Sequence, residues 1–390
     1  MTSTARAEQH RPAAGTRAEP PAPQRTRRRI PVGAVIGAVV LLVLVIVPFT
    51  GGLTVPFVFD GALSSSRTQL ILAAALLFAC VAISYDVVFG YTGLLNAGHA
   101  TVFAAALYAT NIGMELGVPF VPAALIAVVL ATALGAGIGA LSLRARGLGF
   151  AMVTLAFCEA FSTLLVTDPF RVFGGEEGRP LAFEQVPSIL LQARNVKWLY
   201  WLALATLVLV AVIALVATRS QCGRVWLAVR ENEQRVEMLG LNPFAYKLVA
   251  YSFSSFLAAI AGTVYLIVVR AANPASASVE FSLAMIVMVV IGGRGRLWGA
   301  ALGGFLYGIL TLRLPSLSSS GALDGLPGWA GRVLAEPLFV LGVVFILIVL
   351  FAPGGVGGAV DAVRRRIRAS GRSRSANGPG SPPASRQDAP

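Results

Sequence analysis

The stretch TQLILAAALLFACVAISYDVVF, residues 68–89, carries one charged side chain, Asp86, in an otherwise apolar run. About 20 helical residues span the hydrocarbon core of a membrane, and a helix satisfies its own backbone hydrogen bonds there. We therefore expect a transmembrane helix. Comparable apolar windows recur along the chain and bring the expected number of spans to about ten: 32–49, 99–113, 119–143, 148–166, 198–217, 246–269, 280–293, 297–313 and 333–352.

The composition agrees with a membrane protein. The chain has 390 residues, of which 56% are hydrophobic, a mean hydropathy of +0.76 and 41 glycines. Glycine is common where transmembrane helices pack closely. We predict an all-α polytopic protein with one transmembrane domain, residues 31–353, in which helices are short or broken at glycine-rich turns.

The net charge of +13 lies mainly in the two ends of the chain. Residues 1–30 and 354–390 are rich in Arg, Pro, Ser and Ala without hydrophobic periodicity, so both are predicted to be disordered basic tails. Such tails suit anionic headgroups of the bilayer better than nucleic acid. RTRRRIP before the first window resembles a signal-peptide n-region, but no small-residue cleavage site follows, which favours an uncleaved first span.

Lys and Arg in short connections indicate the cytoplasmic side of a membrane protein. Basic tails at both ends predict that both termini are cytoplasmic, which requires an even number of spans. Alternation then places the basic connections at 144–146, 218–247 and 294–296 inside as well. The chain is expected in the cytoplasmic membrane, with residues 167–197 as its longest external segment.

The segment VRENEQRVEMLG, residues 229–240, is the polar exception, with five charged residues in twelve. As one helix it would carry an apolar stripe with Asn232 at its centre, made by Val225, Val229, Val236 and Leu239. Gly240 suits the C′ position, and Asn242-Pro243 suits the N-cap and N1 of the next helix. Two interpretations stay open: an ordinary interfacial helix, or a docking element for a partner.

Several stretches in order resemble one family. GYTGLLNAGHATVF, RARGLGFAMVTLAFCEAF, FGGEEG, the loop RVWLAVRENEQRVEMLGLNPFAYKLVAYSF, IGGRGRLWG and FAPGGVGG are similar to motifs of the permease subunits of branched-chain amino-acid ABC importers, closest to the M-type subunit. The resemblance extends over most of the membrane domain. The sequence departs from the family pattern at Asn96, Phe173 and Arg296, which leaves the substrate open.

The resemblance implies a coupling loop, about 218–245, that seats in the ATP-binding subunits. The positions that match the family's coupling motif are Ala228, Arg230, Glu231, Asn232, Glu233 and Gly240. No Walker A sequence occurs in the chain, so ATP would be hydrolysed by separate polypeptides. The implied partners are two ABC ATP-binding subunits, a second homologous permease subunit, an extracytoplasmic solute-binding protein and the lipid bilayer.

Candidate pathway or gate residues lie at the glycine turns and in the fifth window: Asn96, Gly98, His99, Glu159, Gly293 and Gly295. His99 is interpreted as a structural residue rather than a proton carrier. Glu159 is a carboxylate inside a predicted span and so needs a cavity or a partner. Asp86 stands where the family often carries Asn, and the sequence identifies no partner for it.

We therefore expect a permease subunit that translocates branched-chain or related amino acids, and not an enzyme. Another small polar solute, such as urea or an amide, stays open. Rival hypotheses are an ion-coupled secondary transporter, a membrane anchor and an integral-membrane enzyme. The last would need a cluster of catalytic or metal-binding residues; the three widely spaced cysteines form no such pattern, and we predict no cofactor and no metal.

Overall fold

The computed structural model describes residues 42–50, 65–191, 196–319 and scattered positions from 339 to 358. The chain divides into two compact units, Met1–Ile46 and Val47–Pro390, and the helices and strands named below belong to the second unit. The predicted basic tails and the windows 32–49 and 333–352 lie wholly or largely outside the described residues.

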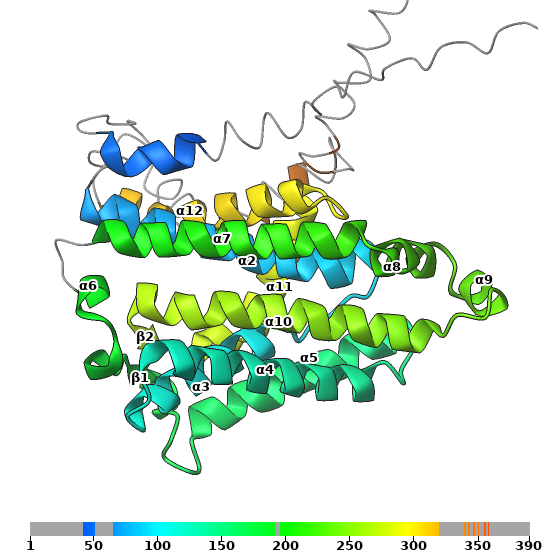
Figure 1. Ribbon diagram of the computed structural model, residues 1–390, viewed down its shortest axis with the longest axis horizontal. Helices are drawn as coiled ribbons and strands as arrows, with labels where there is room; N and C mark the ends of the chain where they lie inside the picture. Colours follow the sequence, from blue (N-terminus) through cyan, green and yellow to red (C-terminus); the bar gives the residue numbers. More distant parts are fainter. Residues whose placement is uncertain are drawn as a thin grey trace, which may run out of the picture. The chain divides into compact units, whose positions relative to one another are not determined.

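Every predicted window between residues 68 and 313 coincides with a helix (Figure 1). These are α2 Ser66–Asp86, α3 His99–Glu115, α4 Phe120–Ser142, α5 Leu148–Thr167, α7 Val196–Arg219, α10 Pro243–Val269, α11 Val279–Gly292 and α12 Leu297–Ser319. The shorter elements are α6 Ser188–Leu191, α8 Gln221–Glu231, α9 Glu233–Met238, and the strands β1 Arg179–Pro180 and β2 Ala271–Ala272. Single helical turns occupy Val47–Phe49, Val87–Tyr91, Gly175–Glu177, Phe183–Gln185 and Pro274–Ala277.

Among the described residues, 5 helices are long and apolar enough to cross a membrane: α2 with its C-terminal extension to Tyr91, α4, α5, α7 and α10. Two further apolar stretches, Val279–Gly292 and Leu297–Arg313, are shorter. The helical class is confirmed, whereas ten crossing helices are not. The short length predicted for the window 280–293 agrees with α11.

Polar caps fix where several helices begin. The Ser65 and Ser278 hydroxyls accept hydrogen bonds from the first turns of α2 and α11, at Thr68 N and Phe281 N. Asn242 caps α10 by accepting from Phe244 N at 3.0 Å, and Pro243 occupies the first turn, as predicted. These caps bind backbone N–H groups that have no partner inside the helix.

α2 lies at the centre of the helix packing and is buried along almost its whole length. It contacts α12, α7, α10 and α11, while α10 also packs against α3 and α4. The run of small residues in α2, including Ala73, Ala75, Ala79 and Ala82, lets these neighbours approach closely. The stretch 68–89 is therefore the core around which the other helices pack.

The connections gather at two opposite ends of the bundle. Figure 1 shows α8 and α9 beyond one end of α7 and α10, and β1, β2 and α6 at the other end. The turn after α2 lies at the α8–α9 end, because Arg230 of α8 donates to the Gly90 carbonyl. The turn between α11 and α12 lies there too, because Gly295 N donates to Asp86 at the end of α2. Two of the basic connections, 218–247 and 294–296, thus lie at the same end, as the predicted alternation requires. Which end faces the cytoplasm stays a prediction.

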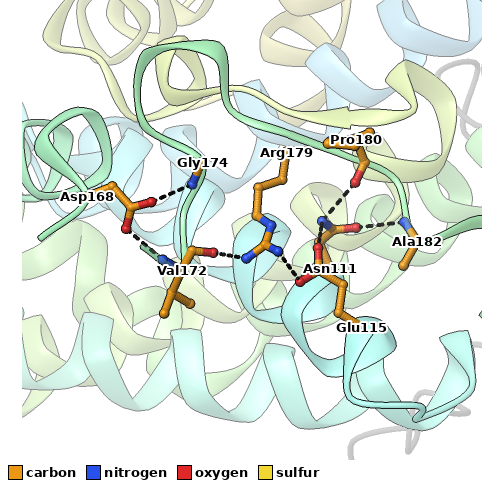
Figure 2. A network of polar contacts seen from close by, with 8 residues as sticks. All are labelled: Asn111, Glu115, Asp168, Val172, Gly174, Arg179, Pro180 and Ala182. Atoms are coloured by element: carbon orange, nitrogen blue, oxygen red, sulfur yellow. Dashed lines mark hydrogen bonds and ion pairs between the residues drawn. The ribbon is translucent and has the colours of Figure 1, made fainter. Parts of the chain in front are cut away.

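A polar network closes the end opposite α8 and α9 (Figure 2). The Arg179 guanidinium pairs with Glu115 at the end of α3 at 2.9 Å and donates to the Val172 carbonyl. Asn111 of α3 donates to the Pro180 carbonyl at 3.1 Å and accepts from Ala182 N at 3.2 Å. The 168–187 segment is thus fastened to α3, and β1 pairs antiparallel with β2.

Asp168 organises the start of this segment. Its carboxylate accepts hydrogen bonds from Val172 N and Gly174 N, both at 2.8 Å (Figure 2). Desolvation raises the pKa of the Asp168 carboxyl, but three backbone amides and the charge of Arg179 outweigh it and hold the pKa below its ordinary value. The charged form is therefore the one that binds the loop.

Replacing Asp168 by asparagine is expected to loosen the 168–187 segment, because the side chain keeps one acceptor oxygen for two backbone amides. Because the pKa of Asp168 is lower in the folded protein, the ionised carboxylate stabilises the loop at pH values above its unfolded pKa of about 3.9. This stabilisation is lost as the pH falls through the folded pKa. Proteolysis of the purified protein should cleave the D168N segment faster than wild type at neutral pH. Glu184→Gln, an exposed neighbour, is the control; equal rates in all three proteins contradict the prediction.

Candidate functional site

The predicted coupling segment is helical but broken. α8 ends at Glu231, and Asn232 has extended backbone angles, φ −161° and ψ 107°. Its side chain accepts from Arg235 N at 3.0 Å and so caps α9. The prediction of one helix with Asn232 at the centre of an apolar stripe is wrong, because asparagine makes a better N-cap than a helix interior residue. Of the predicted stripe, Val229 and Val236 are buried, and Leu239 is 75% exposed.

Three contacts fix this segment to the membrane helices. The Trp226 indole N–H of α8 donates to the Tyr246 carbonyl of α10 at 3.1 Å. Glu233 of α9 pairs with Lys247 of α10 at 2.5 Å. Arg230 reaches the glycine turn after α2 and donates to the Gly90 carbonyl. A displacement of α8 and α9 is therefore resisted by α10 and by the end of α2.

The six residues assigned to coupling are all exposed: Ala228, Arg230, Glu231, Asn232, Glu233 and Gly240. Arg230 and Glu233 also contact the membrane helices. Sequence reasoning missed Met238 at the tip, which is 84% exposed, and it placed Leu239 on the apolar stripe although Leu239 is 75% exposed. These two neighbouring side chains put apolar surface at the tip of an otherwise charged connection.

Gly240 ends α9 as predicted. Its φ of +80° lies in the left-handed region, Gly240 N donates to the Glu237 carbonyl at 2.9 Å, and Leu241 N donates to the Val236 carbonyl at 3.3 Å. This pair of hydrogen bonds is the Schellman arrangement, in which glycine is favoured because it has no Cβ. The turn gives the exposed tip a defined shape.

The glycine turns after α2 and after α11 meet beside Arg230. Asp86 Oδ1 accepts a hydrogen bond of 2.7 Å from Gly295 N, so the partner that the sequence left unidentified for Asp86 is the backbone of the 293–296 turn. The Arg294 guanidinium lies 4.6 Å from the centre of the Phe89 ring. A Cβ at Gly355 would meet Gly293 N at 2.5 Å, so part of the FAPGGVGG motif lies against the same turn.

The charges at this junction are close enough to influence one another. Burial and the neighbouring Arg230 lower the pKa of the Arg294 guanidinium, and the charge of Asp86 opposes the shift. Two cations from different connections thus face one carboxylate at the end of α2. We name the set Asp86, Gly90, Arg230, Arg294 and Gly295 the glycine-turn junction. It links α8 to α2 and to the α11–α12 turn.

The other predicted turn residues form a separate buried network. Asn96 Oδ1 accepts from Gly98 N at 2.9 Å, which orients the amide so that Nδ2 donates to His99 Nδ1 at 3.3 Å. His99 Nε2 then carries the proton and donates to Ser84 Oγ at 3.0 Å. With both ring nitrogens engaged, His99 joins α2 to α3, which agrees with a structural role for it.

The start of α3 is also tied to α5 and α11. Ala97 N donates to Thr154 Oγ1 of α5 at 3.1 Å, and Ala100 N donates to Ser282 Oγ of α11 at 3.1 Å. Cys158 of α5 donates to the Ala277 carbonyl before α11 at 3.2 Å. The N-termini of α3 and α11 therefore meet beside the middle of α5.

The structure divides the predicted pathway residues into three groups. Asn96, Gly98 and His99 share the buried network, Gly293 and Gly295 belong to the turn at the glycine-turn junction, and Glu159 stands apart on the exposed side of α5. None of these placements tests a role in translocation, which stays a prediction.

A comparison with known proteins finds a match to one protein family. The model of a family described as the branched-chain amino acid transport system / permease component matches residues 68–352. The high-affinity branched-chain amino acid transport system permease protein LivM of Escherichia coli (strain K12) is 29% identical over 269 residues, covering 62% of this chain and 62% of the relative. The match thus spans less than two thirds of that relative's length.

Two further likenesses are weaker. The autoinducer 2 import system permease protein LsrC of Escherichia coli (strain K12 / DH10B) is 27% identical over 181 residues, covering 45% of this chain and 47% of the relative. Among solved structures, PsaBC from Streptococcus pneumoniae in complex with Fab aligns with a TM-score of 0.38 and 14% identity, covering 74% of this chain and 92% of that chain. A TM-score this low assigns no fold.

Proposed function

Since this chain belongs to the family of branched-chain amino acid transport system permease components, as the match over residues 68–352 shows, we propose that it is the membrane-spanning subunit of an ABC importer. The proposed substrates are branched-chain or related amino acids, and the energy comes from ATP hydrolysed by separate subunits. The multi-pass helical structure, with 5 described helices long enough to cross a membrane, supports this proposal.

The observation that carries the proposal is the anchored α8–α9 segment. Its inner side is fixed by Trp226, Glu233 and Arg230, and its outer side presents Met238 and Leu239 to a partner. We propose that this surface seats in the ATP-binding subunits, one such subunit for each permease of the pair. The exposed apolar tip supports docking, because the buried centre of a protein interface is enriched in apolar side chains such as Met.

The mechanism follows from the contacts. Closure of the two ATP-binding subunits moves α8 and α9. Arg230 transmits that movement to the turn after α2, and Asp86 transmits it through Gly295 to the turn between α11 and α12. The helices on either side then convert a cavity between this permease and a second, homologous one from outward-facing to inward-facing.

The remaining parts of the proposal concern partners and placement. An extracytoplasmic solute-binding protein delivers the solute, and it does most of the selecting. The protein lies in the cytoplasmic membrane with both termini inside, residues 31–353 form the membrane domain, and residues 1–30 and 354–390 are basic tails against the bilayer. The proposal includes no nucleic-acid partner.

Two alternatives stay behind this proposal. A permease for another small polar solute, such as urea or an amide, shares the same architecture and coupling segment. Among relatives, one is named for autoinducer 2 import, so related permeases differ in solute. An ion-coupled secondary transporter would use Asp86 or Glu159 as an ion site, and the engagement of Asp86 by Gly295 N disfavours it.

The test changes Glu233 and Gly240. Glu233→Ala removes the ion pair with Lys247, and Gly240→Val places a β-branched residue at φ +80°, which costs about 1–2 kcal/mol. Both variants should retain membrane insertion but lose co-purification of the ATP-binding subunits and, with it, amino-acid uptake.

Gly117→Val is the matched control. Gly117 also has positive φ, +88°, and open space around it, but it lies in the turn after α3 at the other end of the bundle. It should strain its own turn and leave co-purification unchanged. If Glu233→Ala and Gly240→Val also keep full co-purification and uptake, the docking role is wrong.

A further inference from the structure

α5 has two chemically different sides. Its buried side carries Phe150, Thr154, Cys158 and Leu165, which pack inside this chain. On its other side, exposed residues recur every three or four positions, as residues on one side of a helix do. They are Leu148, Met152, Ala156, Glu159, Ala160, Thr163 and Val166. The second set faces away from the rest of the part of the chain that the structure describes.

Glu159 lies in the interior of the span. At a rise of about 1.5 Å per residue, Glu159 lies about 17 Å along the helix from Leu148, the first residue of α5. It lies about 12 Å from Thr167, the last residue. The neighbouring Cys158 bonds to the Ala277 carbonyl just before α11, so this level is where α11 begins. Glu280, in the first turn of α11, is also exposed.

Glu159 has no counter-charge among the described residues. Within the part of the chain that the structure describes, its carboxylate forms neither an ion pair nor a hydrogen bond with another side chain. A carboxylate in the hydrocarbon core is costly and almost always faces a water-filled cavity or a partner. The exposed side of α5 at this level therefore does not face lipid.

α4 provides the comparison. The large exposed side chains of α4 are all aliphatic, and no exposed residue of α4 is charged, which suits lipid: Val121, Leu125, Ile126, Val129, Leu130, Leu134 and Leu141. The exposed side of α5 instead places Glu159 between the small residues Ala156, Ala160 and Thr163. These small side chains do not cover the carboxylate, so it is open on this side of the helix.

We propose that this side of α5 lines the aqueous path between this permease and the second permease subunit, and that the Glu159 carboxylate receives the ammonium group of the passing amino acid. The inference rests on the proposed function and adds a binding residue to it. Charge complementarity carries the assignment: an amino acid brings one cationic group, and Glu159 is a carboxylate without a counter-ion in the described chain.

The first experiment measures whether Glu159 faces water. Glu159→Cys is made in a Cys222→Ser background, since Cys222 is exposed and Cys80 and Cys158 are buried. A membrane-impermeant, charged thiol reagent is applied to proteoliposomes that contain the whole importer complex. Glu159→Cys should react at least about tenfold faster than Val129→Cys on the lipid side of α4, because such reagents modify only thiolates in water. Excess leucine should slow the reaction.

The second experiment measures uptake. Glu159→Gln keeps the size of the side chain and removes its charge, so the ATP-binding subunits should still co-purify while leucine uptake falls at least about tenfold, the loss expected for one charge-assisted hydrogen bond. Val129→Ala on the lipid side of α4 is the control, and its uptake should equal that of wild type. Equal labelling of Glu159→Cys and Val129→Cys overturns the path, and unchanged uptake by Glu159→Gln overturns the ammonium site.

The labelling result does not depend on ATP hydrolysis. If the wild-type complex imports no amino acid, the proposed function fails, whereas the labelling pattern still decides whether α5 lines water. The two failures are therefore distinguishable.

Discussion

Replacing Arg230 with alanine is expected to lower ATP-dependent uptake by about tenfold or more, since a hydrogen bond to a charged group contributes about 1.5–3 kcal/mol. Arg230 joins the coupling segment to the Gly90 carbonyl, and Asp86 continues the connection to the α11–α12 turn. Without Arg230, α8 stays fixed to α10 through Trp226 but no longer pulls on the end of α2. Uptake is the measurement, in vesicles that contain the complete complex.

The matched control is Arg235→Ala, which removes an exposed arginine from α9 in the same segment. Its backbone N–H, which Asn232 caps, is retained. Both variants should bind the ATP-binding subunits as wild type does, and only Arg230→Ala should uncouple ATP hydrolysis from uptake. Loss of the ATP-binding subunits from Arg230→Ala alone would assign Arg230 to the partner interface and contradict an internal link.

The helices were predictable because the physics leaves few choices. A run such as 68–89 can avoid water only by becoming a buried helix, and α2 is that helix. The same reasoning placed a helix at each of the eight apolar windows between residues 68 and 313, and the structure has a helix at each of them. It could not say which helix lies at the centre, because apolar residues suit lipid and protein neighbours equally.

The coupling segment shows where periodicity misleads. Val229 and Val236 fit one helical stripe and are both buried, yet the chain between them breaks at Asn232. The local signal was present: asparagine before an acidic residue is a helix start, and Glu233 stands in the first turn of α9. Capping chemistry outweighed a stripe of a few apolar residues.

The glycine-turn junction shows what one sequence withholds. The motif resemblance located the turn at Gly90 and the turn at Gly295, but nothing in either turn says that Asp86 binds the other. The two partners of that hydrogen bond are 209 positions apart. Such a pairing comes from the packing of α2 against α11 and α12, which hydropathy does not encode.

Replacing Gly90 with alanine is the change expected to do most harm at this junction. A Cβ there would overlap the Asp86 carboxylate and lie 2.5 Å from Gly295 N, so the two turns must separate. Overpacking of this kind costs about 1–3 kcal/mol. Uptake should be lost as well, because the link from α8 to the α11–α12 turn passes through these atoms. Thermal unfolding in detergent and uptake in vesicles measure the two effects.

Gly137→Ala in α4 is the matched control, because a Cβ at Gly137 meets nothing within 4 Å. Alanine in an open helical site is neutral or stabilising by about 0.5–1 kcal/mol. If Gly90→Ala unfolds at the same temperature as Gly137→Ala, the turns are not in contact as described. Asp86→Ala adds the decisive comparison: once the carboxylate is absent, Gly90→Ala should cost less than it does alone. The clash and the hydrogen bond involve the same oxygen, Asp86 Oδ1, so the effects of the two changes should not add. Additive effects in this double-mutant cycle would show that Asp86 does not contact the 293–296 turn, and would contradict the proposed link.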